Sequence, residues 1–393
     1  MTTPSNADRM PPVLKALLFG NFAIGCGVSG LAATLPEISS SLGVSVARAG
    51  GLITASSLMV AVGAPLCAAV VAGWDRRRLL SFAALWFGLL HIVAAAVPGI
   101  DSLMAVRVMA MIAPAIFTPQ AASSVPMLVP PELRARAITF IFLGFSSSAV
   151  LGVPLAAWIG GTWGWRVTFA FIGAMGVINA IWIWRTMPDG VRATRLSAAA
   201  WSRTLRSPAL MSTLAVTLTF GTGQFILWSY IAPYLKGQVG FSTGELSLVL
   251  MWFGMVGLAG NALMSRTVDR TGPAAAVMTS LALSAVTLAA WPLATGFALV
   301  AVIIAPWALG YYASNSAQQA RLAGIAPQLA SASIALNTSA IYGGQAAGSA
   351  IGAALIALGR WDALHWAALA AMLVAMAGSA LATRLARMHA LAA

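Results

Sequence analysis

The sequence predicts an all-α integral membrane protein in which twelve transmembrane helices form two pseudo-symmetric six-helix bundles. Hydrophobic residues make up 60% of the 393 residues and charged residues only 8%, whereas a soluble domain carries about a quarter charged residues. The apolar residues fall into stretches of about 20, the length that a helix needs to cross a bilayer. Features of the first half also recur in the second. Lipid must therefore solvate most of the molecular surface.

Twelve apolar stretches predict the spans. They cover residues 14–36, 50–72, 79–98, 102–126, 138–158, 167–187, 210–234, 244–265, 274–294, 298–320, 332–357 and 363–385. The longest polar segment divides them six and six. We therefore predict an N-terminal half over 1–187, a cytoplasmic linker over 188–208 and a C-terminal half over 209–393. The first stretch is interpreted as a span, so no cleavable signal peptide is expected.

The net charge of +13 is informative because of where the lysines and arginines lie along the chain. If the N-terminus is cytoplasmic, most of the 22 lysines and arginines fall on the cytoplasmic side, as the positive-inside rule describes. Both termini are then cytoplasmic in a multi-pass protein. Basic loops beside anionic lipid account for the charge. The expected partner is the lipid bilayer, and no nucleic-acid partner is expected.

An internal duplication supports the division into halves. At an offset of 197 residues, identical residues coincide in order: Pro36 with Pro233, Gly43 with Gly240, Ser45 with Ser242 and Gly63 with Gly260. A series of matches at a constant offset is what a repeat predicts. Transporters built from such repeats bind their substrate between the repeats, near the bilayer midplane.

Several motifs resemble those of the major facilitator superfamily, and the bacterial drug and sugar efflux branch of proton antiporters is the most similar. The residues 103–108, Leu-Met-Ala-Val-Arg-Val, resemble the span 4 motif that contains an arginine. The run Gly164-Trp165-Arg166 is typical of the loop before span 6. The resemblance covers nearly the whole chain. It implies the major facilitator fold, antiport that serves drug efflux or antibiotic resistance, and a place in the bacterial cytoplasmic (inner) membrane.

The same resemblance implies a gate and a bend. Gly260 to Gly272 match the loop motif between spans 8 and 9, with Asp269, Arg270 and Gly272 in place. The Asp269 carboxylate is expected to face the start of span 5, near Arg134 and Arg136, and to latch the cytoplasmic side. The antiporter signature of span 5 is approximated by Gly144, Gly152 and Pro154, which permit close packing and a bend. Solvated loop charges and simple helix packing are the alternative interpretations.

The acidic residues restrict the class of substrate. None of the nine lies near the middle of a predicted span, and Glu37 and Asp101 are the deepest, at outer ends. Many proton-coupled relatives carry an acid in span 1, where this chain has Gly27 and Val28. A cation in a low-dielectric site needs a carboxylate partner. We therefore expect a neutral, zwitterionic or anionic small-molecule substrate, with Glu37 and Asp101 as candidates for coupling.

Arg107 is the one charge well inside a predicted span. Placing an arginine there costs at least ~2.5 kcal/mol on insertion scales, so an intramembrane charge indicates function. We expect Arg107 to bind an anionic or carbonyl group and to respond to protonation nearby. Snorkelling to the outer interface, helped by Asp101 or Glu37, is the alternative. His91 in span 3 is a further candidate for coupling because histidine titrates near neutral pH, although a hydrogen-bonded packing role also fits.

Polar and aromatic residues at helical spacing predict the lining of a central cavity. Steps of about four residues place such side chains on one face of a helix, and a few polar groups among aromatics suit a small amphiphilic ligand. The predicted lining is Arg107, Asn21, Gln120, Phe220, Gln224, Trp228, Trp307, Tyr311, Asn315 and Gln318 or Gln319, with Asn337, Tyr342 and Gln345 as weaker members. Ordinary helix packing is the alternative for each.

The leading functional hypothesis is a proton-coupled exporter that works by alternating access, without enzymatic activity. The sequence contains no Walker motif, dinucleotide fingerprint, catalytic triad or metal-ligand spacing, so no cofactor or metal is expected. Cys26 and Cys67 are interpreted as unpaired thiols. Protons are the expected coupling ion, and we expect a monomer. An uncoupled facilitator or importer of a neutral or anionic metabolite, and a membrane receptor that does not transport, remain alternatives.

Overall fold

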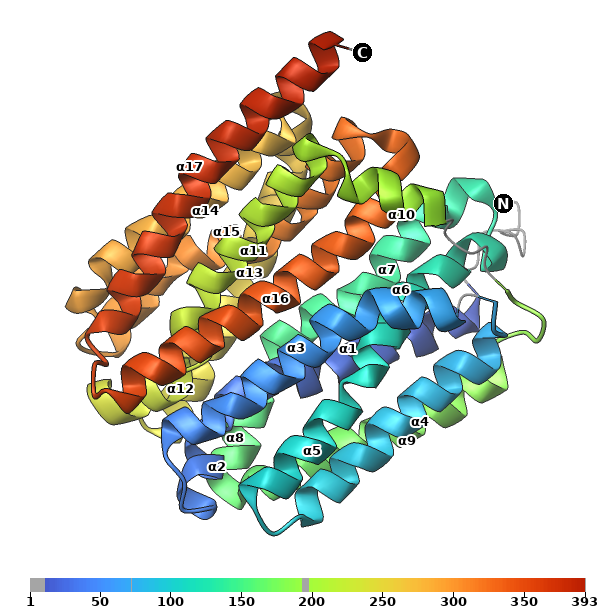
Figure 1. The fold of residues 1–393 in the computed structure, drawn as a ribbon. Coiled ribbons are helices and arrows are strands. Elements are labelled where there is room, and N and C mark those ends of the chain that lie inside the picture. The colour runs from blue at the N-terminus through green and yellow to red at the C-terminus, as the bar shows by residue number, and fades with distance from the viewer. Residues whose placement is uncertain (1–10, 72, 193–197, 393) are drawn as a thin grey trace, which may run out of the picture.

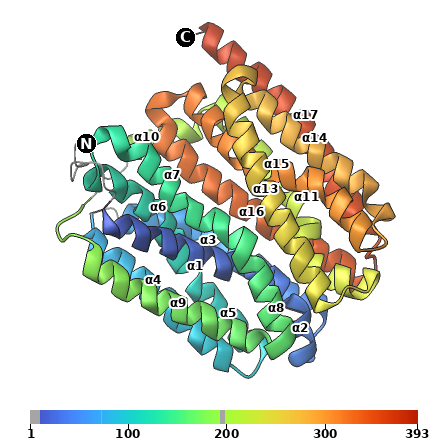
Figure 2. The same ribbon diagram turned by 180° about the vertical axis from the view of Figure 1, so that it is seen from behind.

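The computed structural model describes residues 11–71, 73–192 and 198–392, apart from a few side chains within these ranges. Every regular element in the described ranges is helical (Figure 1). Most helices run roughly alongside one another. The α-helices of residues 12–186 and those of residues 208–392 form two groups that lie side by side in both views (Figures 1 and 2).

The first group contains the six spans of the N-terminal half. Its elements are α1 (Pro12–Ala33), α2 (Leu35–Ser41), α3 (Val46–Val71), α4 (Arg76–Ala96), α5 (Ile100–Ala110), α6 (Ile112–Leu128), η2 (Pro131–Leu133), α7 (Arg134–Ser147), η3 (Ser148–Gly152), α8 (Val153–Trp163) and α9 (Trp165–Thr186). Helix α4 packs along α9, and α1 packs along α7. The buried side chains between them form the core of this half.

The second group contains the six spans of the C-terminal half. Its elements are α11 (Pro208–Trp228), α12 (Ile231–Tyr234), η4 (Leu235–Val239), α13 (Thr243–Thr271), α14 (Pro273–Ala290), η5 (Trp291–Leu293), α15 (Phe297–Ile325), η6 (Pro327–Leu329), α16 (Ala330–Ala357) and α17 (Ala363–Ala392). Helix α11 packs between α16 and α17, and α15 packs against α13 and α14. Helix α10 (Ala198–Leu205) lies within the predicted linker, whose residues 193–197 lie outside the described ranges.

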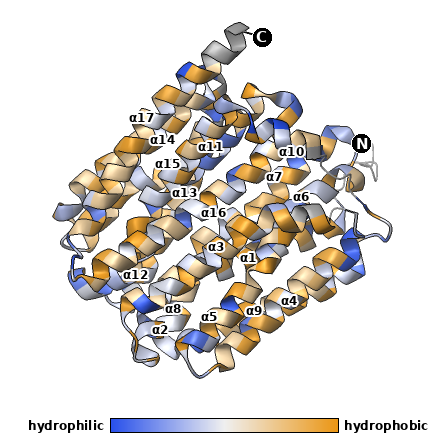
Figure 3. Cartoon of the chain, viewed as in Figure 1, coloured by the Kyte–Doolittle hydropathy of each residue, from blue (hydrophilic) through white to orange (hydrophobic). Residues whose placement is uncertain are grey.

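The twelve predicted spans are confirmed, because the described ranges contain twelve helical segments that are long and apolar enough to cross a bilayer. Their ends differ from the prediction by a few residues, as for Ile100–Leu128 against the predicted 102–126. Hydrophobic residues occupy the middle of the bundle, and the more hydrophilic ones concentrate toward its two ends (Figure 3). An even number of spans places the start of α1 and the end of α17 on the same side, which we call the terminal side. The opposite side is called the far side.

The fourth span is interrupted, which the sequence analysis did not anticipate. Helix α5 ends at Ala110, Met111 caps it, and α6 begins at Ile112. Pro114 is the third residue of α6. A proline lacks the amide hydrogen that would bond to the residue four positions earlier, and its ring crowds that carbonyl group. The break therefore lies one turn after Arg107.

The fifth span changes geometry where the glycines and proline predicted a bend. Residues Ser148–Gly152 form the π-helical segment η3, and Pro154 lies in the first turn of α8. Glycine is needed before this segment, at Gly144, and at its last residue, Gly152, for close packing. An added Cβ would lie 2.0 Å from the Leu18 carbonyl oxygen at Gly144, and 2.2 Å from Cys26 Sγ at Gly152. Both contacts hold this span against α1.

The backbone at the far side supports the internal duplication. Gly43, after α2, has φ +62°, and Gly240, after η4, has φ +84°. Residues with a side chain rarely adopt this conformation, so glycine is required at both equivalent turns. Ser45 Oγ accepts a hydrogen bond from the Arg48 amide, and Ser242 Oγ accepts one from the Glu245 amide. The matched residues thus perform the same local task in the two halves.

The halves meet along two seams. Helix α3 packs against α16, and η3 and α8 pack against α13. Toward the far side, Lys236 Nζ of the second half donates to Glu37 Oε1 of the first half at 2.5 Å. Ser349 Oγ donates to the Gly50 carbonyl oxygen at 3.3 Å. These polar contacts hold the two halves together near their far-side ends.

Candidate functional site

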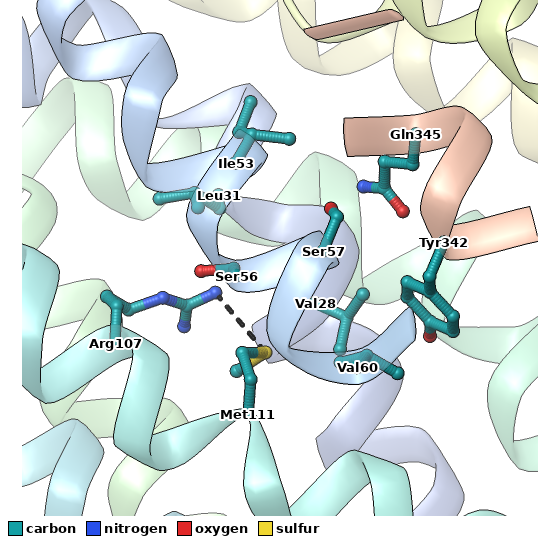
Figure 4. Close-up of a pocket in the computed structure, with 10 residues that line it drawn as sticks. All are labelled: Val28, Leu31, Ile53, Ser56, Ser57, Val60, Arg107, Met111, Tyr342 and Gln345. Carbon is teal, nitrogen blue, oxygen red and sulfur yellow. Dashed lines mark hydrogen bonds between the residues drawn. The ribbon is translucent and has the colours of Figure 1, made fainter. Parts of the chain in front are cut away.

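A small pocket lies between the halves, on the α3–α16 seam (Figure 4). Helices α1, α3 and α16 and the broken fourth span contribute its walls. It is lined by Val28, Leu31, Ile53, Ser56, Ser57, Val60, Arg107, Met111, Tyr342 and Gln345. The cavity is small, with a volume of about 10 Å³, which is roughly room for one water molecule. A larger ligand therefore requires the halves to separate.

Arg107 is the charged group of this pocket and is only 1% exposed. Its Nη1 contacts His91 Nε2 at 2.8 Å, its Nη2 donates to the Gly27 carbonyl oxygen at 3.0 Å, and Nη2 also contacts Met111 Sδ at 4.0 Å. The guanidinium carbon lies 5.5 Å from the centre of the Phe169 ring. Arg107 therefore stays inside the N-terminal half instead of reaching the interface beside Asp101 or Glu37.

His91 completes a buried pair with Arg107 and is also 1% exposed. Its Nδ1 lies 2.8 Å from the Phe87 carbonyl oxygen, one turn earlier on α4. Its ring centre lies 4.1 Å from that of Phe87 and 5.7 Å from that of Phe169. Both ring nitrogens therefore have a polar neighbour, and aromatic rings exclude water from the pair.

Some polar atoms at the pocket have no protein partner. Arg107 Nε and Ser56 Oγ are both buried without a hydrogen bond. Burying a donor or acceptor unpaired costs about 1–3 kcal/mol, so such atoms indicate a place for a ligand or water. Ser57 and Gln345, which are 3% and 8% exposed, add further polar side chains to the lining. The pocket thus offers hydrogen bonds and one positive charge, but no carboxylate.

The other predicted lining residues of the N-terminal half lie away from this pocket. Asn21 Nδ2 donates to the Ile141 carbonyl oxygen at 3.0 Å, and Asn21 Oδ1 accepts from Thr118 at 3.0 Å. Gln120 Oε1 accepts from Ser123 at 3.3 Å. Asn21 therefore joins α1, α6 and α7, whereas the Gln120 contact stays within α6. Both fit the helix-packing interpretation of these amides.

The predicted aromatic residues of the C-terminal half gather in one cluster. The ring of Trp228 on α11 lies 4.2 Å from Phe253 on α13, 5.6 Å from Trp307 and 5.7 Å from Tyr311, both on α15. Trp307 is fully buried. Phe220, earlier on α11, is also buried in this core. None of these rings is among the residues that line the pocket on the α3–α16 seam in this conformation.

A network of amides connects α11, α15 and α16. Asn315 Oδ1 accepts from Asn337 at 3.1 Å and from Gln319 at 3.2 Å. Gln318 Nε2 donates to Thr217 Oγ1, which donates to Asn337 Oδ1. Gln224 Nε2, also on α11, is buried without a partner. The structure therefore groups Asn337 with Asn315 and Gln319, which the helical spacing places on one face of the tenth span, but not around Arg107.

The two outer carboxylates occupy different environments. Glu37 pairs with Lys236, and both side chains are mostly buried, with 14% and 22% exposed. Asp101 pairs with Arg48 at the surface, and its side chain is 81% exposed. Neither contacts Arg107. Glu37 therefore belongs to the far-side seam, and Asp101 to an exposed ion pair of the kind that contributes little energy.

The predicted gate residues lie on the terminal side, but the Asp269 side chain lies outside the described residues. Gly272 has φ +83° and caps α13, which explains the requirement for glycine there. Arg134 Nη2 donates to the Pro126 carbonyl oxygen at 3.0 Å. Arg136 and Arg270 are exposed. The latch between Asp269 and these arginines stays a prediction.

Sequence reasoning missed the contribution of the second span. Ser56 and Ser57 lie on α3 and face the pocket together with Ile53 and Val60. The spacing of four residues between Ser56 and Val60 puts them on one helix face, but the same pattern occurs in ordinary packing. Tyr342 and Gln345, which the sequence ranked below other residues, do line the pocket. Within the described part of the chain, no three metal-ligating side chains are grouped.

Comparison with known proteins defines the class to which this fold and pocket belong. The family described as Major Facilitator Superfamily matches residues 17–342. The chain therefore belongs to the major facilitator superfamily, and its general function is membrane transport.

The relatives include proteins named for transport, for chloramphenicol resistance and, in Helicobacter pylori, for probable sugar efflux. The chain is 27% identical over 364 residues to the uncharacterized MFS-type transporter YbcL of Bacillus subtilis (strain 168), which covers 92% of this chain and 93% of that one. It is 28% identical over 346 residues to the inner membrane transport protein YdhP of Escherichia coli (strain K12), with 88% and 89% covered. It is 32% identical over 270 residues to the chloramphenicol resistance protein of Streptomyces lividans, with 66% and 68% covered.

Solved structures agree on the fold. A bacterial homolog of the human lysosomal transporter Spinster, in an inward-facing and unoccupied conformation, superposes with a TM-score of 0.75 and 17% identity, covering 96% of this chain and 97% of that one. A mutant form of the peptide transporter POT gives a TM-score of 0.74 with 15% identity, covering 96% and 95%. At such identities the likeness concerns the fold alone.

Proposed function

We propose that this protein is a proton-coupled exporter of a small amphiphilic compound that is neutral, zwitterionic or anionic. One observation carries the proposal: a buried arginine faces a pocket between the two halves, and no carboxylate lines that pocket. An unpaired carboxylate would be needed to compensate a buried cation. The relatives named for chloramphenicol resistance and sugar efflux support export of uncharged compounds.

The contacts between the halves support transport by alternating access. The Glu37–Lys236 pair and the Ser349–Gly50 contact close the far side. With cytoplasmic termini, the far side is the outer side of a bacterial inner membrane, as in the relative from Escherichia coli that is named an inner membrane transport protein. The conformation then corresponds to an outward-closed state. Rocking of the halves would open the pocket to the outside and release the substrate.

In this mechanism the two halves close around the narrow pocket. Arg107, Ser56 and Ser57 present donors from the N-terminal half, and Gln345 presents an amide from the C-terminal half. A ligand that accepts hydrogen bonds from both halves would stabilise the closed state relative to the open states. Proton entry from outside supplies the driving force in the proposal. A monomer contains both halves and so the complete pocket.

The proposal is tested by growth inhibition of an efflux-deficient bacterium that expresses the chain, with panels of cationic, neutral and anionic compounds. We expect resistance to neutral or anionic compounds, including chloramphenicol as the first probe. Arg107→Ala should abolish this resistance at an unchanged level of membrane-inserted protein. Arg48→Ala is the matched control, because it removes an arginine from an exposed ion pair and should leave resistance intact.

The outcomes separate the competing functions. Resistance to cations alone would contradict the charge argument. Resistance that survives collapse of the proton gradient would favour the uncoupled facilitator. Binding of a compound by the purified protein without any flux in vesicles would favour a receptor.

A further inference from the structure

The hydrogen bonds of the His91–Arg107 pair determine which ring nitrogen of His91 carries the hydrogen. A guanidinium group donates hydrogen bonds and cannot accept them. His91 Nε2, at 2.8 Å from Arg107 Nη1, must therefore be the acceptor. The ring hydrogen is then on Nδ1, which donates to the Phe87 carbonyl oxygen at 2.8 Å. The ring is neutral in this conformation, and its one free lone pair is occupied by Arg107.

The surroundings of His91 offer no other charge to compensate a proton. Helix α1 contributes Gly27, α9 contributes Phe169 and Ile172, and α4 itself contributes Phe87. The broken fourth span contributes Arg107, and beyond Arg107, across the pocket, α3 contributes Ser56. Among these side chains Arg107 is the charged one and His91 the other titratable one. A proton on His91 would thus place two cations in direct contact.

Gly27 allows the pair to form. A Cβ at this position would lie 2.9 Å from His91 Nε2 and 2.5 Å from Phe87 Cζ. Any side chain here would push the imidazole away from α1 and from the carbonyl group that accepts from Arg107 Nη2. The position of His91 therefore depends on the absence of a side chain at residue 27. His91 occupies the space that a side chain of the first span would otherwise fill.

We propose that His91 is the proton-binding site of this transporter and that its protonation displaces Arg107 from the pocket. The proton binds to the Nε2 lone pair, and the Arg107 Nη1–Nε2 hydrogen bond is lost. The two adjacent cations then repel each other. His91 and Gly27 hold Arg107 beside the pocket, so displacement of Arg107 takes a donor away from a bound substrate. Proton and substrate therefore compete, which is the requirement for antiport.

This inference rests on the proposed function and names the residue that performs its coupling. Competition between two ligands is reciprocal: the proton lowers affinity for substrate by the same factor as substrate lowers affinity for the proton. A free histidine changes its charge between about pH 5 and 8. In this conformation Arg107 opposes the proton on His91, so protonation of the ring and displacement of Arg107 occur together. A lone mid-membrane carboxylate is not required for such a mechanism.

The first experiment measures the protonation state and the tautomer of the His91 ring directly, and it needs no substrate. The chain has three histidines, so ¹⁵N-histidine NMR of the full protein in nanodiscs, with His365→Gln and His389→Gln as assignment variants, isolates His91. We expect a neutral ring with the hydrogen on Nδ1, and Arg107→Gln should change that signal. A ring that is protonated at neutral pH, or that carries its hydrogen on Nε2, would overturn the proposal.

The second experiment tests coupling in proteoliposomes with a compound identified in the growth panel, starting with chloramphenicol. A glutamine can accept from Arg107 but does not titrate, so His91→Gln should lose uptake driven by an imposed pH gradient. Its substrate affinity should no longer vary with pH. Gly27→Ala should weaken coupling by displacing His91. His365→Gln is the matched control, because this histidine is also buried but lies on α17, and it should behave as wild type.

Different results would contradict the proposed proton coupling and the proposed role of His91. If wild-type protein exchanges substrate but ignores the pH gradient, proton coupling itself is wrong, and the role of His91 falls with it. If wild-type transport follows the gradient and His91→Gln transports equally well, the exporter stands and His91 is not the proton site.

Discussion

Gly254 tests whether the α13–η3 seam controls the balance between conformations. It lies on α13 directly against the backbone of η3 from the other half. A Cβ at this position would lie 2.6 Å from the Ala149 carbonyl oxygen and 2.7 Å from Val150 Cα. Both neighbours are backbone atoms, so no flexible side chain can move aside. Ordinary contact begins at 3.4 Å, and Gly254→Ala therefore forces the halves apart locally by roughly 0.8 Å.

The expected effect is a shift of population away from the closed far side. Overpacking a well-packed contact costs about 1–3 kcal/mol, and the cost falls on the conformation in which α13 and η3 touch. A difference of this size changes the ratio of two conformations by roughly 5- to 150-fold. The far-side-open conformation should therefore gain population, because separation of the halves relieves the clash.

Spin-label distances across the far side measure this shift. Labels at Ser40 and Gln238, which are exposed on α2 and η4, report the separation of the halves after Cys26 and Cys67 are replaced by alanine. Gly254→Ala should increase the share of long distances.

Two glycines provide matched controls for this prediction. A Cβ at Gly260 would lie 2.2 Å from the Leu309 carbonyl oxygen of the same half, so Gly260→Ala should lower stability without moving the labels. Gly324 has open space around it, and its alanine variant should change nothing. Unchanged distances in Gly254→Ala, or an equal shift in Gly260→Ala, would refute the reasoning.

Other predictions concern the two ends of the bundle. Glu37→Gln leaves the mostly buried Lys236 without its ion-pair partner and should weaken far-side closure by about 1–2 kcal/mol; the Glu37→Lys, Lys236→Glu double variant should restore the short label distances, and failure to do so would argue against a direct pair. Asp75 caps α4 and accepts from the Gly190 amide at 2.7 Å, so Asp75→Ala should cost about 1–2 kcal/mol. A lower midpoint of thermal unfolding in detergent checks this, and an unchanged midpoint would contradict it.

The spans were predictable because the bilayer imposes one solution on the backbone. Without water, each amide and carbonyl group must pair within its own helix, so an apolar stretch of about 20 residues leaves little choice. Short far-side elements such as Leu35–Ser41 and Ile231–Tyr234 were not distinguished from the spans. The interruption at Met111 was also missed, since a proline marks a weak point in a helix but does not say whether neighbouring helices will bridge it.

The candidate site was predictable only in part. Arg107 and His91 stand out because polar side chains are expensive in an apolar helix. Their contact joins α5 to α4 across a loop, and no periodicity reveals it. Trp228 and Trp307 do lie on regular helix faces, yet spacing along a helix cannot show whether a face meets a cavity or another helix. Ser56 was overlooked because serines are common between packed membrane helices.

Each half contributes different side chains to the proposed mechanism, and this division bears on how an exporter of this kind works. The N-terminal half contributes Arg107 and His91 beside the pocket, whereas the C-terminal half holds the aromatic cluster of Trp228 and Trp307 and the amides around Asn315. On the proposed mechanism, protonation is therefore sensed by one half and ligand contact is completed by the other. Only a conformation that brings the α3–α16 seam together allows Arg107 and Gln345 to hold the same ligand. Loss of Arg107 from the pocket removes that shared contact, so a single proton on the N-terminal half is sufficient to release a ligand that the two halves hold between them.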